Sequence, residues 1–260
     1  MDYRLHETTL VFAAAIITSG CEADYSLSPP ADSVKVTVRV KVPELLEVET
    51  MDVMYRSPIC QRTRYSASGV PYQVDGFHKI RMDLIREGES NFYSKAVPRN
   101  GGGECEWNLN SVTFGVRIAN PGRYGENVRY RAGGGVVAIF DEHRAPNGDA
   151  DYNVSGDLII KEDYYPWVDE FHLGQDRKTV SLAGKGHIYL MYRSLQARLV
   201  YFEPIFHPEF IVLSVGPTIK KKGNNIIFTY PDGTVQDDLS YLPNFRKMEE
   251  IRLKSGPSQQ

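Results

Sequence analysis

Five valines at every second position from 34 to 42 form the most restrictive pattern in the chain. The residues between them are lysine, threonine or arginine. Because successive side chains of a β-strand point to opposite faces, all five valines share one face. A strand with one apolar and one polar face is typical of antiparallel sheets that are solvated on one side. The pattern therefore predicts a β protein with such sheets.

More segments rich in β-branched and aromatic residues follow at short intervals, separated by turn signals such as Asn100-Gly101 and Pro231-Asp232-Gly233. The expected strands cover residues 51–56, 78–85, 92–97, 111–118, 128–132, 136–140, 157–161, 187–192, 198–202, 210–215 and 225–230. Many short strands with this punctuation predict a mainly β fold, an antiparallel β-sandwich or two packed β subdomains.

One short helix is expected near the carboxyl end. It begins near Pro243, its apolar residues Phe245, Met248 and Ile251 recur about every three positions, and Gly256 provides a stop. Residues 255–260 form a flexible tail by composition. The polar stretch 144–153 predicts either a boundary between two β-rich halves, 33–143 and 154–254, or a surface loop within one continuous domain, 33–254.

The first 20 residues are typical of a signal peptide. Arg4 precedes an apolar run at 10–17, and small residues lead to Cys21. This run is far shorter than the roughly 20 residues of a membrane-spanning helix. The small residues before Cys21 resemble a bacterial lipobox, although Thr18 stands where leucine is usual. We expect lipidation at Cys21 and a tether over 21–32; the alternative is ordinary cleavage with Cys21 as a bystander. Either way the protein is exported.

The charge balance and motifs indicate which functions not to expect. The chain has 30 basic and 33 acidic side chains without long blocks of one sign, so we expect no nucleic-acid partner. Neither the G-x-S-x-G nor the H-E-x-x-H pattern occurs. Residues 149–153 begin like a calcium loop, but Val154 and Ile160 stand where an EF-hand needs glycine and glutamate. A solvated acidic turn is expected there, and the alternative is a calcium site of another type near Asp149. We expect no enzyme activity, no catalytic residues, no cofactor and no metal.

With Cys21 acylated, Cys60 and Cys105 are the remaining cysteines. Two such cysteines usually pair in an oxidising periplasm, so a disulfide is expected. The alternative is a cysteine–histidine nucleophile, which would need a reactive thiol in a compartment that oxidises thiols.

Two stretches, 61–72 and 162–170, combine aromatic residues with arginine or with acids, a composition that favours protein interfaces. We expect both to lie in exposed loops that contact a partner; the alternative is that they pack back on the body of the protein. The predicted partner-binding residues are Arg62, Arg64, Tyr65, Tyr72, Tyr164, Tyr165 and Trp167.

Three segments carry a family resemblance: Met54-Tyr55-Arg56-Ser57-Pro58-Ile59-Cys60, Gly102-Gly103-Glu104-Cys105-Glu106-Trp107 and Val112-Thr113-Phe114-Gly115-Val116. Together they resemble small periplasmic immunity lipoproteins that accompany type VI secretion effectors, often phospholipases. The resemblance covers about the first third to half of the mature chain and carries over no catalytic residue. It implies a paired Cys60 and Cys105 and a lipid-anchored envelope protein that binds and occludes a lipolytic effector. The alternatives are a structural or assembly lipoprotein and, third, an envelope hydrolase.

Overall fold

The computed structural model describes residues 24–143, 145–146, 148–174, 176–185, 189–238 and 240–256. The predicted signal peptide, Cys21, the first residues of the predicted tether and residues 257–260 lie outside the described residues. The strands are β1 Lys35–Lys41, β2 Leu46–Val48, β3 Met51–Tyr65, β4 Pro71–Met82, β5 Ile85–Arg86, β6 Phe92–Pro98, β7 Asn100–Gly102, β8 Trp107–Ile118, β9 Arg129–Gly133, β10 Gly135–Ile139, β11 Tyr152–Asn153, β12 Leu158–Phe171, β13 Arg177–Ala183, β14 Tyr189–Arg193, β15 Leu199–Phe206, β16 Val212–Val215, β17 Ile226–Thr229 and β18 Val235–Asp238. A 3-10 helix spans Pro121–Tyr124, and α1 spans Phe245–Lys254.

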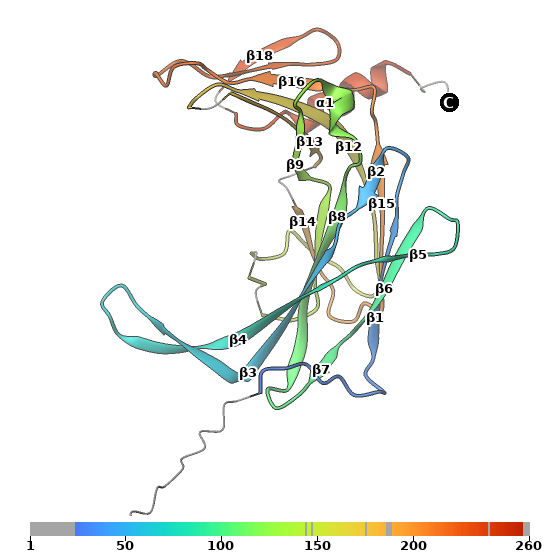
Figure 1. The fold of residues 1–260 in the computed structure, drawn as a ribbon, viewed down its shortest axis with the longest axis vertical. Coiled ribbons are helices and arrows are strands. Elements are labelled where there is room, and N and C mark those ends of the chain that lie inside the picture. The colour runs from blue at the N-terminus through green and yellow to red at the C-terminus, as the bar shows by residue number, and fades with distance from the viewer. Residues whose placement is uncertain are drawn as a thin grey trace, which may run out of the picture.

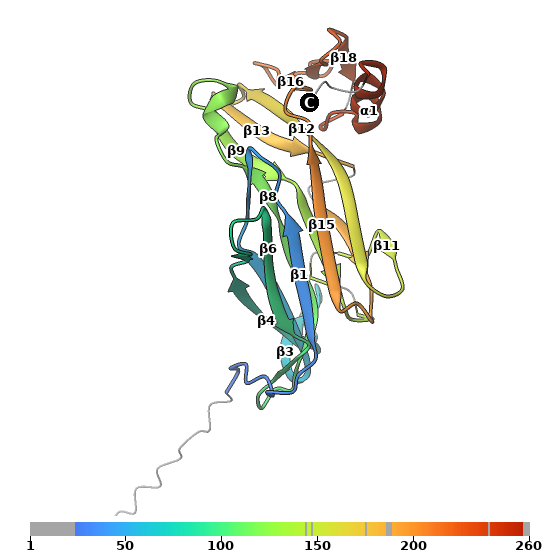
Figure 2. The ribbon, with the colours of Figure 1, turned by 90° about the vertical axis from the view of Figure 1, so that its right-hand side faces the viewer.

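These strands form two sheets that pack against each other (Figures 1 and 2). One sheet has the order β18-β17-β16-β12-β15-β1-β6-β5, with β13 and then β9 beside the far end of β12. The other has the order β11-β14-β10-β8-β3-β4, with β2 and β7 beside β8. The predicted mainly β, sandwich-like fold is therefore confirmed.

The alternating valines lie where the period of two places them. Val36, Val38 and Val40 are fully buried, and Val42 is nearly so. They belong to a core cluster that also contains Val112, Val136 and Phe202 from other strands. Val34, just before β1, is exposed.

The pairing is mixed and not wholly antiparallel. β1 pairs antiparallel with β6 but parallel with β15, and β12 runs parallel to both β15 and β16. In the other sheet β10 pairs antiparallel with β8 and parallel with β14. The alternating valines of β1 are compatible with both parallel and antiparallel neighbours, because the face on which a side chain lies does not depend on the direction of the neighbouring strand.

Strands from both halves of the chain share hydrogen bonds in both sheets. β1 of the first half pairs with β15 of the second, and β10 pairs with β14. The stretch predicted as a boundary contains β11 at its end, which joins β14. Pairing between the two halves is what we expect if residues 33–254 form one continuous β-rich domain and the stretch 144–153 is a surface loop.

The long strand β12 connects the sandwich to a smaller second core. Its first part pairs with β15, and its last part bends away to pair with β13 and β16 (Figures 1 and 2). The second core contains Tyr165, Phe228 and residues of α1.

The predicted helix is confirmed as α1. Asn244 caps it, because its side chain accepts a hydrogen bond from the Lys247 amide at 3.1 Å. Met248 and Ile251 are buried in the second core, and Gly256 follows with a φ of 78°. Within the part of the chain that the structure covers, no helix is long and apolar enough to cross a membrane.

Candidate interaction site

The strands β3 and β4 form a long hairpin whose outer half leaves the sandwich. Met51, Val53 and Tyr55 are buried, whereas the residues from Pro58 to Tyr65 are exposed or half-buried. Figure 1 shows this outer half projecting from the body. We refer to residues 58–74 as the arm. The expected loop at 61–72 is thus mainly strand, with a turn at 66–70.

A bulge and a disulfide hold the base of the arm. Ser57 pairs with Gly76 but Arg62 pairs with Val74, so the intervening residues of β3 bulge outward. Within the bulge, Cys60 is bonded to Cys105. The predicted disulfide is confirmed, and it ties the arm to the turn that precedes β8.

Gly76 is required for this geometry. A Cβ atom at position 76 would lie 2.0 Å from the carbonyl oxygen of Cys60. The hydroxyl of Ser57 accepts hydrogen bonds from the amides of Ile59 and Cys60 and donates to the carbonyl oxygen of Cys105 at 2.5 Å. The backbone of the bulge is therefore fixed from several sides.

A part-buried cluster of charged side chains also holds the base of the arm. Arg56 on β3 contacts Asp141 at 2.6 Å and Asp75 at 2.5 Å. Burial on its own would raise the pKa of Asp141, but hydrogen bonds from Arg56 and His143 outweigh it and lower that pKa to about 2. Hydrogen bonds to the same carboxylates raise the pKa of Arg56, so the Arg56–Asp141 pair is ionised at neutral pH. No sequence motif indicated this cluster, because its members come from distant segments.

Four of the predicted partner-binding residues come together on the arm. Arg64 lies opposite Tyr72, and Arg62 lies opposite Val74, which places both arginines and Tyr72 on one face. Tyr65 lies beside the turn on the other face and is 70% exposed. Residues 57–74 contain no acidic side chain. The arm is therefore a cationic, aromatic surface.

A hollow of about 430 Å³ lies against the arginine-bearing face. Met54, Val74, Phe77 and Pro146 supply its apolar lining, and Lys79 and Asp75 lie at its border. Arg62 also donates a hydrogen bond to the carbonyl oxygen of Phe77 at 3.2 Å. The hollow can take side chains of a partner that the arm contacts.

The other three predicted contact residues are not on a loop. Residues 162–170 belong to β12, where Tyr164, Tyr165 and Trp167 are 3%, 0% and 7% exposed. Tyr164 packs in the sandwich core, and Tyr165 and Trp167 pack in the second core. The prediction that these side chains lie on an exposed surface is wrong, because the sandwich core covers one face of β12 and the second core covers the other.

Comparison with protein-family models, with curated proteins and with solved structures found no match.

His207 and the two acids of the calcium-loop-like segment, Asp149 and Asp151, make structural contacts. His207 Nε2 lies 2.6 Å from Asp163 Oδ1, and its ring stacks on Tyr165. Asp149 pairs with Arg193, and Asp151 accepts a hydrogen bond from the amide of Met191. The Asp149 segment thus joins β14, and within the described residues no group of three or more metal-ligating side chains occurs.

Proposed function

We propose that this protein is a periplasmic immunity lipoprotein, anchored through Cys21, that binds and occludes a type VI secreted lipolytic effector. The main support for a binding function is the geometry of the arm. It exposes arginine and tyrosine side chains on a two-stranded ribbon whose base is fixed by the disulfide and by the ion pairs of Arg56. Arginine and tyrosine are enriched among the residues that contribute most to protein–protein affinity. The resemblance described above supports the choice of partner.

The rigidity of the arm favours tight binding. A free two-stranded ribbon is marginally stable in water, and ordering it on binding would lower affinity. Here the disulfide and the Arg56 cluster hold its base before any partner arrives. The disulfide also supports an oxidising compartment such as the periplasm. The charge of the arm favours an acidic surface on the effector.

The test is a titration of the purified protein into the effector encoded beside its gene, with the lipolytic rate as readout. Occlusion predicts inhibition that saturates near one equivalent. Arg64→Ala should weaken binding by about 2 kcal/mol, roughly thirtyfold. A sharper variant replaces residues 64–72 with Asn-Gly, because Thr63 and Gln73 face each other and can flank a two-residue turn.

The matched control is Lys221→Ala, which changes an exposed cation remote in sequence from the arm. It should inhibit as the wild type does. Inhibition by substoichiometric protein, with turnover, would identify an enzyme acting on the toxin or its product and overturn occlusion. If the variant with Asn-Gly in place of residues 64–72 still inhibits the effector fully, the binding surface lies outside the arm.

The anchor is tested separately by fatty-acid labelling in bacteria. The wild type should incorporate the label and remain with the membrane fraction, and Cys21→Ser should lose both properties. If the wild type takes up no label, Cys21 is a bystander.

A further inference from the structure

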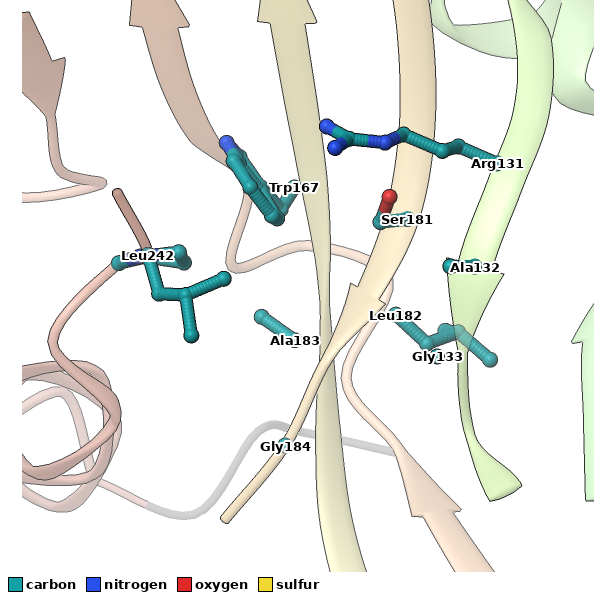
Figure 3. Close-up of a pocket in the computed structure, with 10 residues that line it drawn as sticks. Arg131, Ala132, Gly133, Trp167, Ser181, Leu182, Ala183, Gly184 and Leu242 are labelled. Atoms are coloured by element: carbon teal, nitrogen blue, oxygen red, sulfur yellow. The ribbon is translucent and has the colours of Figure 1, made fainter. Parts of the chain in front are cut away.

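Three neighbouring strands, β9, β13 and β12, present a second surface away from the arm. Trp167 on β12 pairs with Ser181 on β13, and Arg131 on β9 lies in the same row. In Figure 3 the guanidinium of Arg131 points across Ser181 toward the Trp167 ring. The opposite face of these strands packs on the sandwich core through Val168, Val180 and Leu182.

This outer face is strongly cationic. Alternation along the strands places Arg129, Arg131 and Arg177 on it, and all three are exposed. Arg177 lies 4.6 Å over the ring of Phe171, and Arg131 lies 5.8 Å from that of Trp167. Among the described residues, neither Arg129 nor Arg177 forms an ion pair.

The one carboxylate on this face between residues 167 and 171 is that of Asp169, which is buried. Asp169 accepts a hydrogen bond from the Ser214 hydroxyl at 2.6 Å, and Trp167 Nε1 donates to Ser214 at 2.7 Å. Asp169 lies 3.5 Å from Arg131, a long contact that orients the guanidinium and leaves most of its N–H groups for another acceptor.

An apolar pocket opens beside Arg131. Trp167, Ala183, Leu242 and Pro243 form its apolar lining. Leu242, labelled in Figure 3, and Pro243 belong to the segment before α1. Its volume is about 80 Å³. Sites for drug-sized ligands occupy about 300–1,000 Å³, and a closed cavity of about 150 Å³ accepts benzene. The pocket therefore accommodates one small aliphatic side chain and not a lipid acyl chain.

We propose that this surface binds an acidic segment of a partner protein. An aliphatic side chain of that segment enters the pocket between Trp167 and Leu242, and neighbouring carboxylates pair with Arg129, Arg131 and Arg177. Arginine suits this role because its planar guanidinium binds a carboxylate through two parallel hydrogen bonds. The inference goes beyond the proposed function, because it concerns a different surface and does not require that the partner be an effector.

The experiment titrates the purified full-length protein with the synthetic peptide acetyl-Asp-Leu-Asp-Leu-Asp-amide, using calorimetry and tryptophan fluorescence. The chain has two tryptophans. Trp167 lines the pocket, whereas Trp107 is buried in the sandwich core, so a fluorescence change on binding reports Trp167. We expect saturable binding that weakens as salt is added, and no binding of the peptide with lysine in place of aspartate. Arg131→Ala should weaken binding at least tenfold.

Two further variants separate the pocket from the charge. Ala183→Leu fills the pocket while keeping all three arginines, and it should also weaken binding at least tenfold. Arg81→Ala removes a mainly exposed arginine from β4 and should bind as the wild type does.

The proposal is overturned if the acidic peptide does not saturate at millimolar concentration, or if the lysine peptide binds equally well. It is also overturned if both Arg131→Ala and Ala183→Leu bind like the wild type, or if vesicles containing phosphatidylglycerol bind this surface while the peptide does not compete. The arm variants should bind the peptide normally, so failure here and failure of the proposed function are distinguishable.

Discussion

Gly76 shows how one residue without a side chain sets the shape of the arm. Because a Cβ atom there would lie 2.0 Å from the Cys60 carbonyl oxygen, Gly76→Ala forces the bulge apart. We expect a loss of about 2 kcal/mol in the free energy of unfolding, in the range for overpacking. Thermal unfolding measures it. The control is Gly69→Ala in the turn, where φ is 80° but no atom lies within 4 Å, so the loss should be about 1 kcal/mol. Equal losses would contradict the role assigned to the close contact.

Asp141 links the body to the arm in a way that depends on pH. Its pKa in the folded protein is lowered from 3.8 to about 2. Stabilisation by the carboxylate is therefore fully present above the unfolded pKa and is lost as the pH falls from about 4 toward 2. Asp141→Asn should cost about 2 kcal/mol at pH 7 and flatten this part of the stability profile. Urea unfolding between pH 7 and 2 tests this; the same profile in both proteins would rule the linkage out.

At the scale of elements, α1 is held by the second core and by a polar network on its side. Arg252 donates to the hydroxyl of Tyr165 at 2.9 Å, and that hydroxyl donates to Glu249 at 2.8 Å. Asp163 lies 3.8 Å from Arg252, and its pKa is lowered, first by its hydrogen bond to His207. These contacts join the helix to β12 and to the residues after β15.

The apolar face of α1 should contribute most of its docking energy. Met248→Ala removes a fully buried side chain from the second core and should cost about 3 kcal/mol. Leu253→Ala on the same helix is the control, because Leu253 is 67% exposed and should change stability little. Unfolding in urea measures both. A small loss for Met248→Ala would show that the polar network, and not packing, holds the helix.

The arm and β12 show why two stretches that were predicted as loops, 61–72 and 162–170, are largely strand in the structure. The exposed half of β3 has no apolar alternation, because neither of its faces is buried, and the Tyr, Arg, Ser and Gly residues of the stretch 61–72 indicated a loop. In β12, Tyr164 and Tyr165 are both buried because different cores cover its two faces. A continuous apolar run of this kind has no period of two.

At the scale of the whole molecule, strand pairing across the chain predicts that neither half folds alone. A fragment ending at residue 143 would leave β1 and β10 without β15 and β14, and the fragment from 154 would lack the strands that cover its apolar faces. We expect both fragments to aggregate or to lack dispersed amide signals in NMR spectra, and the two together to recover native circular dichroism. A fragment that folds on its own with a cooperative transition would restore the two-domain interpretation.

The sequence by itself determined the local features of this protein. Alternating valines predicted β1, spacing of three with a proline start and a glycine stop predicted α1, and two cysteines left after Cys21 predicted the disulfide. Each of these depends on neighbours along the chain or on a count of residues. Only the tertiary structure decided the direction of the pairing, the burial of Tyr164, Tyr165 and Trp167, and the gathering of Arg56 with Asp75 and Asp141. These three features depend on which distant segment lies beside each strand. A sequence period of two predicts that one face of a strand is buried, but it does not identify the segment that covers that face.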